Sequence, residues 1–178
     1  NSIAWGFGVG AIQYFYARDP QLDVSRYAPQ DHAARVRQVS EWMDATQPDL
    51  STFRARGGKL VMMEYMADYA QSPYAGIRYF ESVQAKMGQD VTQAFARLYT
   101  APGVDHVGSG APAFVDMLPV LTAWVEQGKA PGPLQVVEQE VQAPFPVKRA
   151  LPLCQWPQWP RYKTGEVSQA ASFECVRD

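Results

Sequence analysis

This chain of 178 residues has no large excess of positive or negative charge, no long apolar run and only two histidines. Sixteen Lys and Arg against eighteen Asp and Glu leave a net charge of -2. That balance argues against a nucleic-acid-binding module, because such modules carry a basic excess. No apolar run reaches the roughly 20 residues that a membrane-spanning helix needs. We therefore expect neither a nucleic acid nor a membrane as a partner.

The chain also lacks an initial Met and begins with Asn1. Its hydrophobic content of 47% excludes an intrinsically disordered polymer, and its length suits one domain. The missing Met indicates a processed or truncated chain, so we expect the gene product to be longer.

Two short apolar runs, each followed by a helical pattern, predict the fold class. The runs are residues 59–65 and 94–100, and they suit strands buried on both faces. Helical spacing follows over residues 73–87 and again over residues 114–127, and each pattern is ended by a glycine. Strands alternating with helices predict an α/β fold with parallel strands. Because two strands do not make a stable sheet of this class, we expect the end of a longer α/β domain.

The remaining segments have weaker patterns. Residues 3–16 are apolar and rich in aromatics and glycine, and we expect buried, irregular packing there. Residues 31–43 have the spacing of a helix. After residue 131, short extended runs among prolines predict strands and loops laid over the surface. The predicted parts are a joining segment (1–47), an α/β core (48–131) and an irregular tail (132–178).

Two candidate catalytic residues follow the two predicted strands. Asp68 comes three residues after the first strand, and His106 lies in a glycine-rich loop after the second. In α/β folds ligands bind beyond the carboxyl ends of parallel strands. The order Asp, helix, His is that of the last two members of an α/β-hydrolase triad, in which a carboxylate orients the imidazole that takes the proton of a serine. The alternative is a turn residue at Asp68 and a chance loop residue at His106.

The evidence for other catalytic or metal-ligating residues is weaker. No serine lies in a Gly-x-Ser-x-Gly elbow, and Ser109 follows the histidine loop, so we do not assign it as the nucleophile. We interpret Asp105 as an exposed residue that does not orient its neighbour His106. No Cys, His and Asp cluster has the spacing of a metal site, so we expect neither a metal nor a cofactor in this chain.

Short motifs spread over the chain resemble the tannase and feruloyl esterase family, in the order in which the family carries them. They occupy residues 48–60, 66–68, 97–99, 102–108, 114–118, 124–131, 149–154 with Pro157 and Tyr162, and 172–175. The resemblance covers most of this chain but only the C-terminal third of a family member. It implies the C-terminal part of an α/β-hydrolase that acts on esters of phenolic acids such as gallate and ferulate.

The resemblance also implies the roles of the site residues. Asp68 would be the triad acid and His106 the general base of a serine carboxylesterase. The nucleophilic serine and a large inserted lid with a calcium site would lie upstream of this chain. The partners would then be a small aryl ester and the upstream part of the same protein, and this chain alone would be inactive.

Three positions depart from the family pattern. The family usually carries His-Gly where this chain has Glu64 and Tyr65. Tyr65 would fill space beside the site and Glu64 would add a carboxylate near Asp68, so both are candidate substrate-binding residues. Val107 replaces a cysteine that the family bonds to a cysteine beside the serine. These departures favour an alternative, a degenerate hydrolase that binds a small ligand without turnover.

Cys154 and Cys175 match a pair that the family bridges near its C-terminus. A bridge would staple the proline-rich tail and would indicate an oxidising compartment, periplasmic or secreted. The alternative is two free buried thiols in an intracellular protein.

Overall fold

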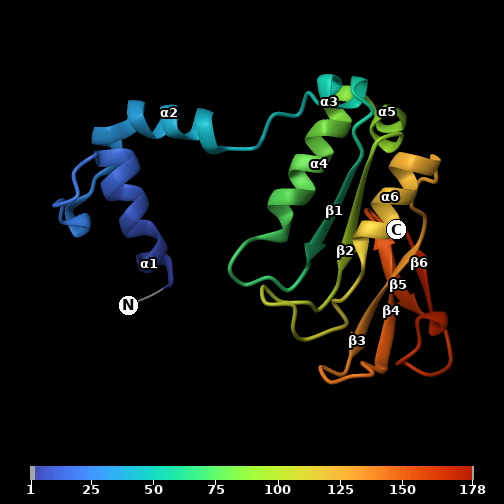
Figure 1. Ribbon diagram of the computed structural model, residues 1–178. Coiled ribbons are helices and arrows are strands. Elements are labelled where there is room, and N and C mark those ends of the chain that lie inside the picture. The colour runs from blue at the N-terminus through green and yellow to red at the C-terminus, as the bar shows by residue number, and fades with distance from the viewer. Residues whose placement is uncertain (1–2, 178) are drawn as a thin grey trace. The chain divides into compact units, whose positions relative to one another are not determined.

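The computed structural model describes residues 3–177, and the chain divides into two compact units, residues 1–46 and 47–178 (Figure 1). The first unit is helical. Its elements are α1 (Ile3–Gly10), the π-helix η1 (Ala11–Ala17), the 3-10 turns η2 (Val24–Arg26) and η3 (Pro29–His32), and α2 (Ala33–Met43). The helix predicted over residues 31–43 is therefore η3 followed by α2.

The prediction of buried, irregular packing over residues 3–16 is wrong. This segment is helical, and the Phe7 side chain is 82% exposed. The aromatic residues of α1, Trp5 and Phe7, are two positions apart and so lie on opposite sides of the helix, which leaves no amphipathic signal in the sequence.

The second unit is built on a four-stranded sheet in the order β1-β2-β4-β3 (Figure 1). Strands β1 (Leu60–Tyr65) and β2 (Ala96–Ala101) are the two predicted strands, and they pair in parallel from Leu60–Ala96 to Tyr65–Ala101. Strand β4 (Val147–Gln155) runs antiparallel to β2, and β3 (Leu134–Gln139) runs antiparallel to β4.

One long helix covers each face of the β1–β2 pair. Successive side chains of a strand point to opposite faces, so Leu98 packs with Ile77 and Phe80 of α4 (Pro73–Met87), whereas Tyr99 lies in a second cluster beside α6 (Met117–Gln127). The short helices are α3 (Ser51–Ala55) and α5 (Gln89–Gln93). None of the helices described over residues 3–177 is long and apolar enough to cross a bilayer.

Helix α6 begins three residues later than its apolar pattern predicts. The Asp116 carboxylate caps it by accepting a hydrogen bond from the Leu118 N–H at 3.1 Å. Phe114, expected on the helix face, lies instead in an isolated β-bridge with Val137. A cap and a cross-strand bridge therefore override the apolar spacing here.

The last segment contributes more to the core than the sequence predicts. Strands β3 and β4 belong to the main sheet instead of lying over its surface, and Leu153 is fully buried. A second sheet pairs β5 (Trp159–Tyr162) with β6 (Phe173–Val176), which follows the 3-10 turn η4 (Ala170–Ser172). The predicted Cys154–Cys175 disulfide is present, with a Cα–Cα distance of 5.6 Å, and joins β4 to β6.

Removing this disulfide tests its contribution to stability. The bridge closes a loop of sequence separation 21, so the chain-entropy relation predicts that Cys154→Ala/Cys175→Ala lowers the free energy of unfolding by about 3 kcal/mol. Urea unfolding followed by tryptophan fluorescence measures this loss. Chemically reduced wild type is the control for lost side-chain packing and should unfold close to the double variant. Equal midpoints for oxidised wild type and variant would contradict the prediction.

Candidate active site

The two parallel strands end side by side, and backbone hydrogen bonds continue their pairing into the segments that follow. The Met66 N–H donates to the Ala101 carbonyl at 3.1 Å, and the Ala67 N–H donates to the Val104 carbonyl at 2.9 Å. Val104 is fully buried and anchors its loop in the core. The turn that carries Asp68 is thereby fixed next to the loop that carries His106.

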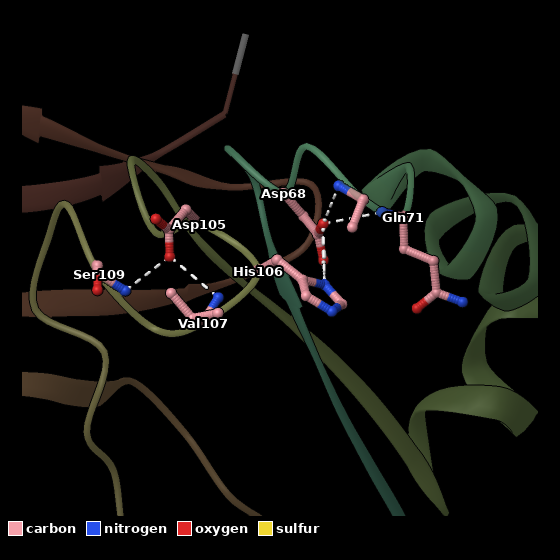
Figure 2. A network of polar contacts seen from close by, with 7 residues as sticks. Asp68, Gln71, Asp105, His106, Val107 and Ser109 are labelled. Carbon is pink, nitrogen blue, oxygen red and sulfur yellow. Dashed lines mark hydrogen bonds and ion pairs between the residues drawn. The ribbon is translucent and has the colours of Figure 1, made fainter. Parts of the chain in front are cut away.

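Asp68 and His106, 38 residues apart in sequence, form a hydrogen-bonded pair at this edge of the sheet (Figure 2). The His106 Nδ1 lies 2.9 Å from Oδ2 and 3.1 Å from Oδ1 of Asp68. The Asp68 side chain is 14% exposed and that of His106 is 46% exposed. The structure thus brings together the two candidate catalytic residues that the sequence indicates.

Backbone donors keep Asp68 ionised. Its Oδ1 accepts hydrogen bonds from the N–H groups of Ala70 and Gln71, both at 2.8 Å. The Gln71 N–H, followed by the hydrogen bond from His106, holds the pKa of Asp68 below its ordinary value. An ionised carboxylate can only accept, so His106 Nδ1 is the donor in this pair, and in the neutral imidazole Nε2 then carries the lone pair. This is the tautomer that a general base needs.

The carboxylate of Asp105 shapes the loop that presents His106. Its Oδ1 accepts hydrogen bonds from the N–H groups of Val107 (3.0 Å) and Ser109 (2.8 Å), as Figure 2 shows. The Asp105 N–H in turn donates to the Ser109 carbonyl at 2.9 Å. Asp105 therefore positions the backbone on both sides of His106, a role that the sequence interpretation missed. The available signal was an Asp at the head of a glycine-rich turn, where its side chain commonly binds the following N–H groups.

Gly110 allows the two ends of the same loop to approach each other closely. Gly110 has a φ of +92°, and a Cβ at this position would lie 2.5 Å from the Gly103 carbonyl oxygen. Only glycine fits both the backbone conformation and the close approach.

Comparison with known proteins then decides the family. The family described as "Tannase and feruloyl esterase" matches residues 1–176. The chain belongs to this family. Both the resemblance seen in the motifs and the α/β fold class are confirmed.

Relatives of this chain carry esterase and hydrolase names. An uncharacterized esterase of Agrobacterium fabrum is 35% identical over 171 residues, which cover 94% of this chain and 31% of the relative. The mono(2-hydroxyethyl) terephthalate hydrolase of Piscinibacter sakaiensis is 38% identical over 139 residues, covering 76% of this chain and 23% of the relative. This chain therefore spans less than a third of the length of either relative.

A solved structure shares the fold of this chain. Feruloyl esterase B from Aspergillus oryzae superposes with a TM-score of 0.80 at 23% identity, covering 96% of this chain and 37% of the other. At this identity the likeness concerns the fold alone.

The two predicted substrate-binding residues lie on opposite faces of β1. Tyr65 packs against the buried cluster on the α6 side, where it has a packing role. Glu64 is half-buried on the α4 side, beside Gly76. Their contact with a substrate stays a prediction. Val107, which replaces the family cysteine, is 70% exposed.

Ser109 belongs to the loop that carries His106. Within the described part of the chain, the Ser109 hydroxyl makes no hydrogen bond to His106; the residue contributes its backbone to the loop. Among residues 3–177 there is no group of three or more His, Cys, Asp or Glu side chains that could hold a metal ion.

The loop role of Asp105 can be measured directly. Asp105→Ala removes the acceptor of two backbone hydrogen bonds, each contributing about 1 kcal/mol, so the Val107 and Ser109 amides should exchange roughly 10-fold faster or more. Asp105→Asn keeps an acceptor oxygen and should retain most of the protection. Amide hydrogen exchange measures both variants. Unchanged exchange in Asp105→Ala would show that the carboxylate does not hold the loop.

Proposed function

We propose that this chain supplies the acid and the base of a serine carboxylic ester hydrolase. The observation that carries the proposal is the Asp68–His106 hydrogen bond, because it leaves Nε2 of the imidazole as a proton acceptor at the carboxyl end of two parallel strands. The nucleophilic serine would come from the upstream part of the same protein, as the short span of this chain relative to its relatives suggests.

In the proposed mechanism His106 moves one proton in each half-reaction. Its Nε2 takes the proton of the serine hydroxyl as the oxygen attacks the ester carbonyl, and the ionised Asp68 stabilises the imidazolium. The imidazolium then protonates the leaving alcohol as the ester C–O bond breaks, leaving an acyl-enzyme. Water then attacks the acyl-enzyme as His106 takes its proton. The imidazolium returns that proton to the serine oxygen as the acyl–serine bond breaks, which releases the carboxylic acid and restores the free serine.

The proposed substrates are small aryl esters, of the gallate or ferulate type. Support comes from the names of relatives, which include a probable feruloyl esterase, a tannase and a terephthalate ester hydrolase. The Cys154–Cys175 disulfide supports a periplasmic or secreted location, because such bridges persist in oxidising compartments.

The upstream part of the protein is the proposed partner of this chain. Large apolar side chains are exposed in both units, including Phe7 (82%) in α1 and Leu118 (72%) in α6. We propose that the upstream part covers some of these side chains, because burial removes apolar surface from water. By itself, the chain holds an acid and a base without an assigned nucleophile, so we expect no turnover from it.

Substitution of His106 in the full-length protein tests the function. His106→Ala should lower kcat/KM for methyl ferulate or methyl gallate by about 1,000-fold or more, because the serine loses its base. His32→Ala replaces the chain's other histidine and should leave kcat/KM unchanged. Unchanged hydrolysis in His106→Ala would refute the proposal.

A fluorophosphonate probe separates the proposal from a binding protein without turnover. The proposal predicts a serine adduct in the full-length protein that is lost in His106→Ala. Absence of an adduct, together with binding of a phenolic ligand and no hydrolysis, would favour the degenerate hydrolase.

A further inference from the structure

A second carboxyl group, that of Glu64, lies near the end of β1, four residues before Asp68 in the sequence, and has no role in the mechanism above. Glu64 stands opposite Thr100 in the β1–β2 register, and its side chain is half-buried between β1 and α4. A polar side chain on the covered face of a sheet is costly to ionise, because burial disfavours the charged form.

The fold makes room for this carboxyl at a specific position of α4. A Cβ built on Gly76 would overlap the Glu64 carboxylate, so the glycine provides the space that the side chain occupies. Glycine inside a helix weakens it relative to alanine. The Gly76–Glu64 contact gives a physical reason for glycine at this position.

Asp68 is the one charged group that interacts with Glu64 among the described residues. Burial, and then the negative charge of Asp68, raise the pKa of Glu64 above its ordinary value. Within residues 3–177, Glu64 forms no ion pair with a cation. Strand β2 presents Thr100 beside it, and the Arg78 side chain on α4 is exposed. Elsewhere on α4, Tyr79 donates to the Gln47 carbonyl, Glu81 accepts from the Trp156 indole, and Lys86 interacts with Asp49.

We propose that Glu64 is a positioning residue that acts electrostatically through Asp68 on His106 and so sets the pH range in which His106 is a neutral base. This inference rests on the proposed function. When Glu64 is protonated, the Asp68 carboxylate is the only negative charge acting on the imidazole from this strand end. When Glu64 ionises, a second negative charge lies behind Asp68 and favours the imidazolium.

The consequence is a shift in the acid limb of the activity profile. Ester hydrolysis needs the neutral imidazole, so a charge that favours the imidazolium moves this limb to higher pH. Glu64→Gln keeps the shape of the side chain in the Gly76 space and removes the charge. The acid limb of kcat/KM should therefore move to lower pH, by about half a unit to one unit.

The experiment compares three forms of the full-length protein: wild type, Glu64→Gln and Glu126→Gln. Glu126 is exposed on α6 and is the control for a lost charge on the other face of the sheet. Two readouts are recorded, the pH profile of kcat/KM for methyl ferulate and the midpoint of the His106 imidazole titration by NMR, assigned with His106→Ala.

The two readouts separate this inference from the proposed function. A lower midpoint in Glu64→Gln but not in Glu126→Gln supports the inference, even if no form hydrolyses the ester and the proposed function fails. Coincident midpoints for wild type and Glu64→Gln overturn the inference, even if hydrolysis depends on His106 as proposed. Equal shifts in Glu64→Gln and Glu126→Gln also overturn it, because they would reflect net charge alone.

Discussion

The hydrogen bond between the Asp68 carboxylate and Nδ1 of His106 is the interaction on which the candidate site depends. It fixes the imidazole tautomer and leaves Nε2 available as a base. The bond exists because β1 and β2 are parallel neighbours whose carboxyl ends meet, and because the Ala67–Val104 backbone hydrogen bond extends their pairing to the residues that carry the two side chains.

Three further constraints keep this geometry in place. Backbone N–H groups after β1 hold the Asp68 carboxylate and favour its ionised form. The Asp105 carboxylate holds the loop around His106 by accepting hydrogen bonds from the Val107 and Ser109 N–H groups. Helices α4 and α6 cover the two faces of the β1–β2 pair. The site therefore lies at the carboxyl edge of a sheet that is packed on both faces.

The sequence predicts the parts of this arrangement that depend on local patterns. Strands β1 and β2, helix α4 and the placement of Asp68 and His106 after the strands follow from apolar runs, caps and spacing. The pairing of β4 with β2 could not be predicted in the same way, because contacts between distant strands leave no local signal. Asp105 was missed since its partners are backbone groups of its own loop, and the exposed faces of α1 carry aromatics that resemble core residues.

The role of the Asp68–His106 hydrogen bond is tested most directly by the tautomer of His106 in the full-length protein, measured by NMR with ¹⁵N-labelled histidine. We expect a protonated Nδ1 and an unprotonated Nε2 in the neutral imidazole of the wild type, with this preference weakened in Asp68→Asn. A neutral His106 that carries its proton on Nε2 in the wild type would contradict the proposed role, because such an imidazole could neither donate to Asp68 nor accept the proton of a serine at Nε2.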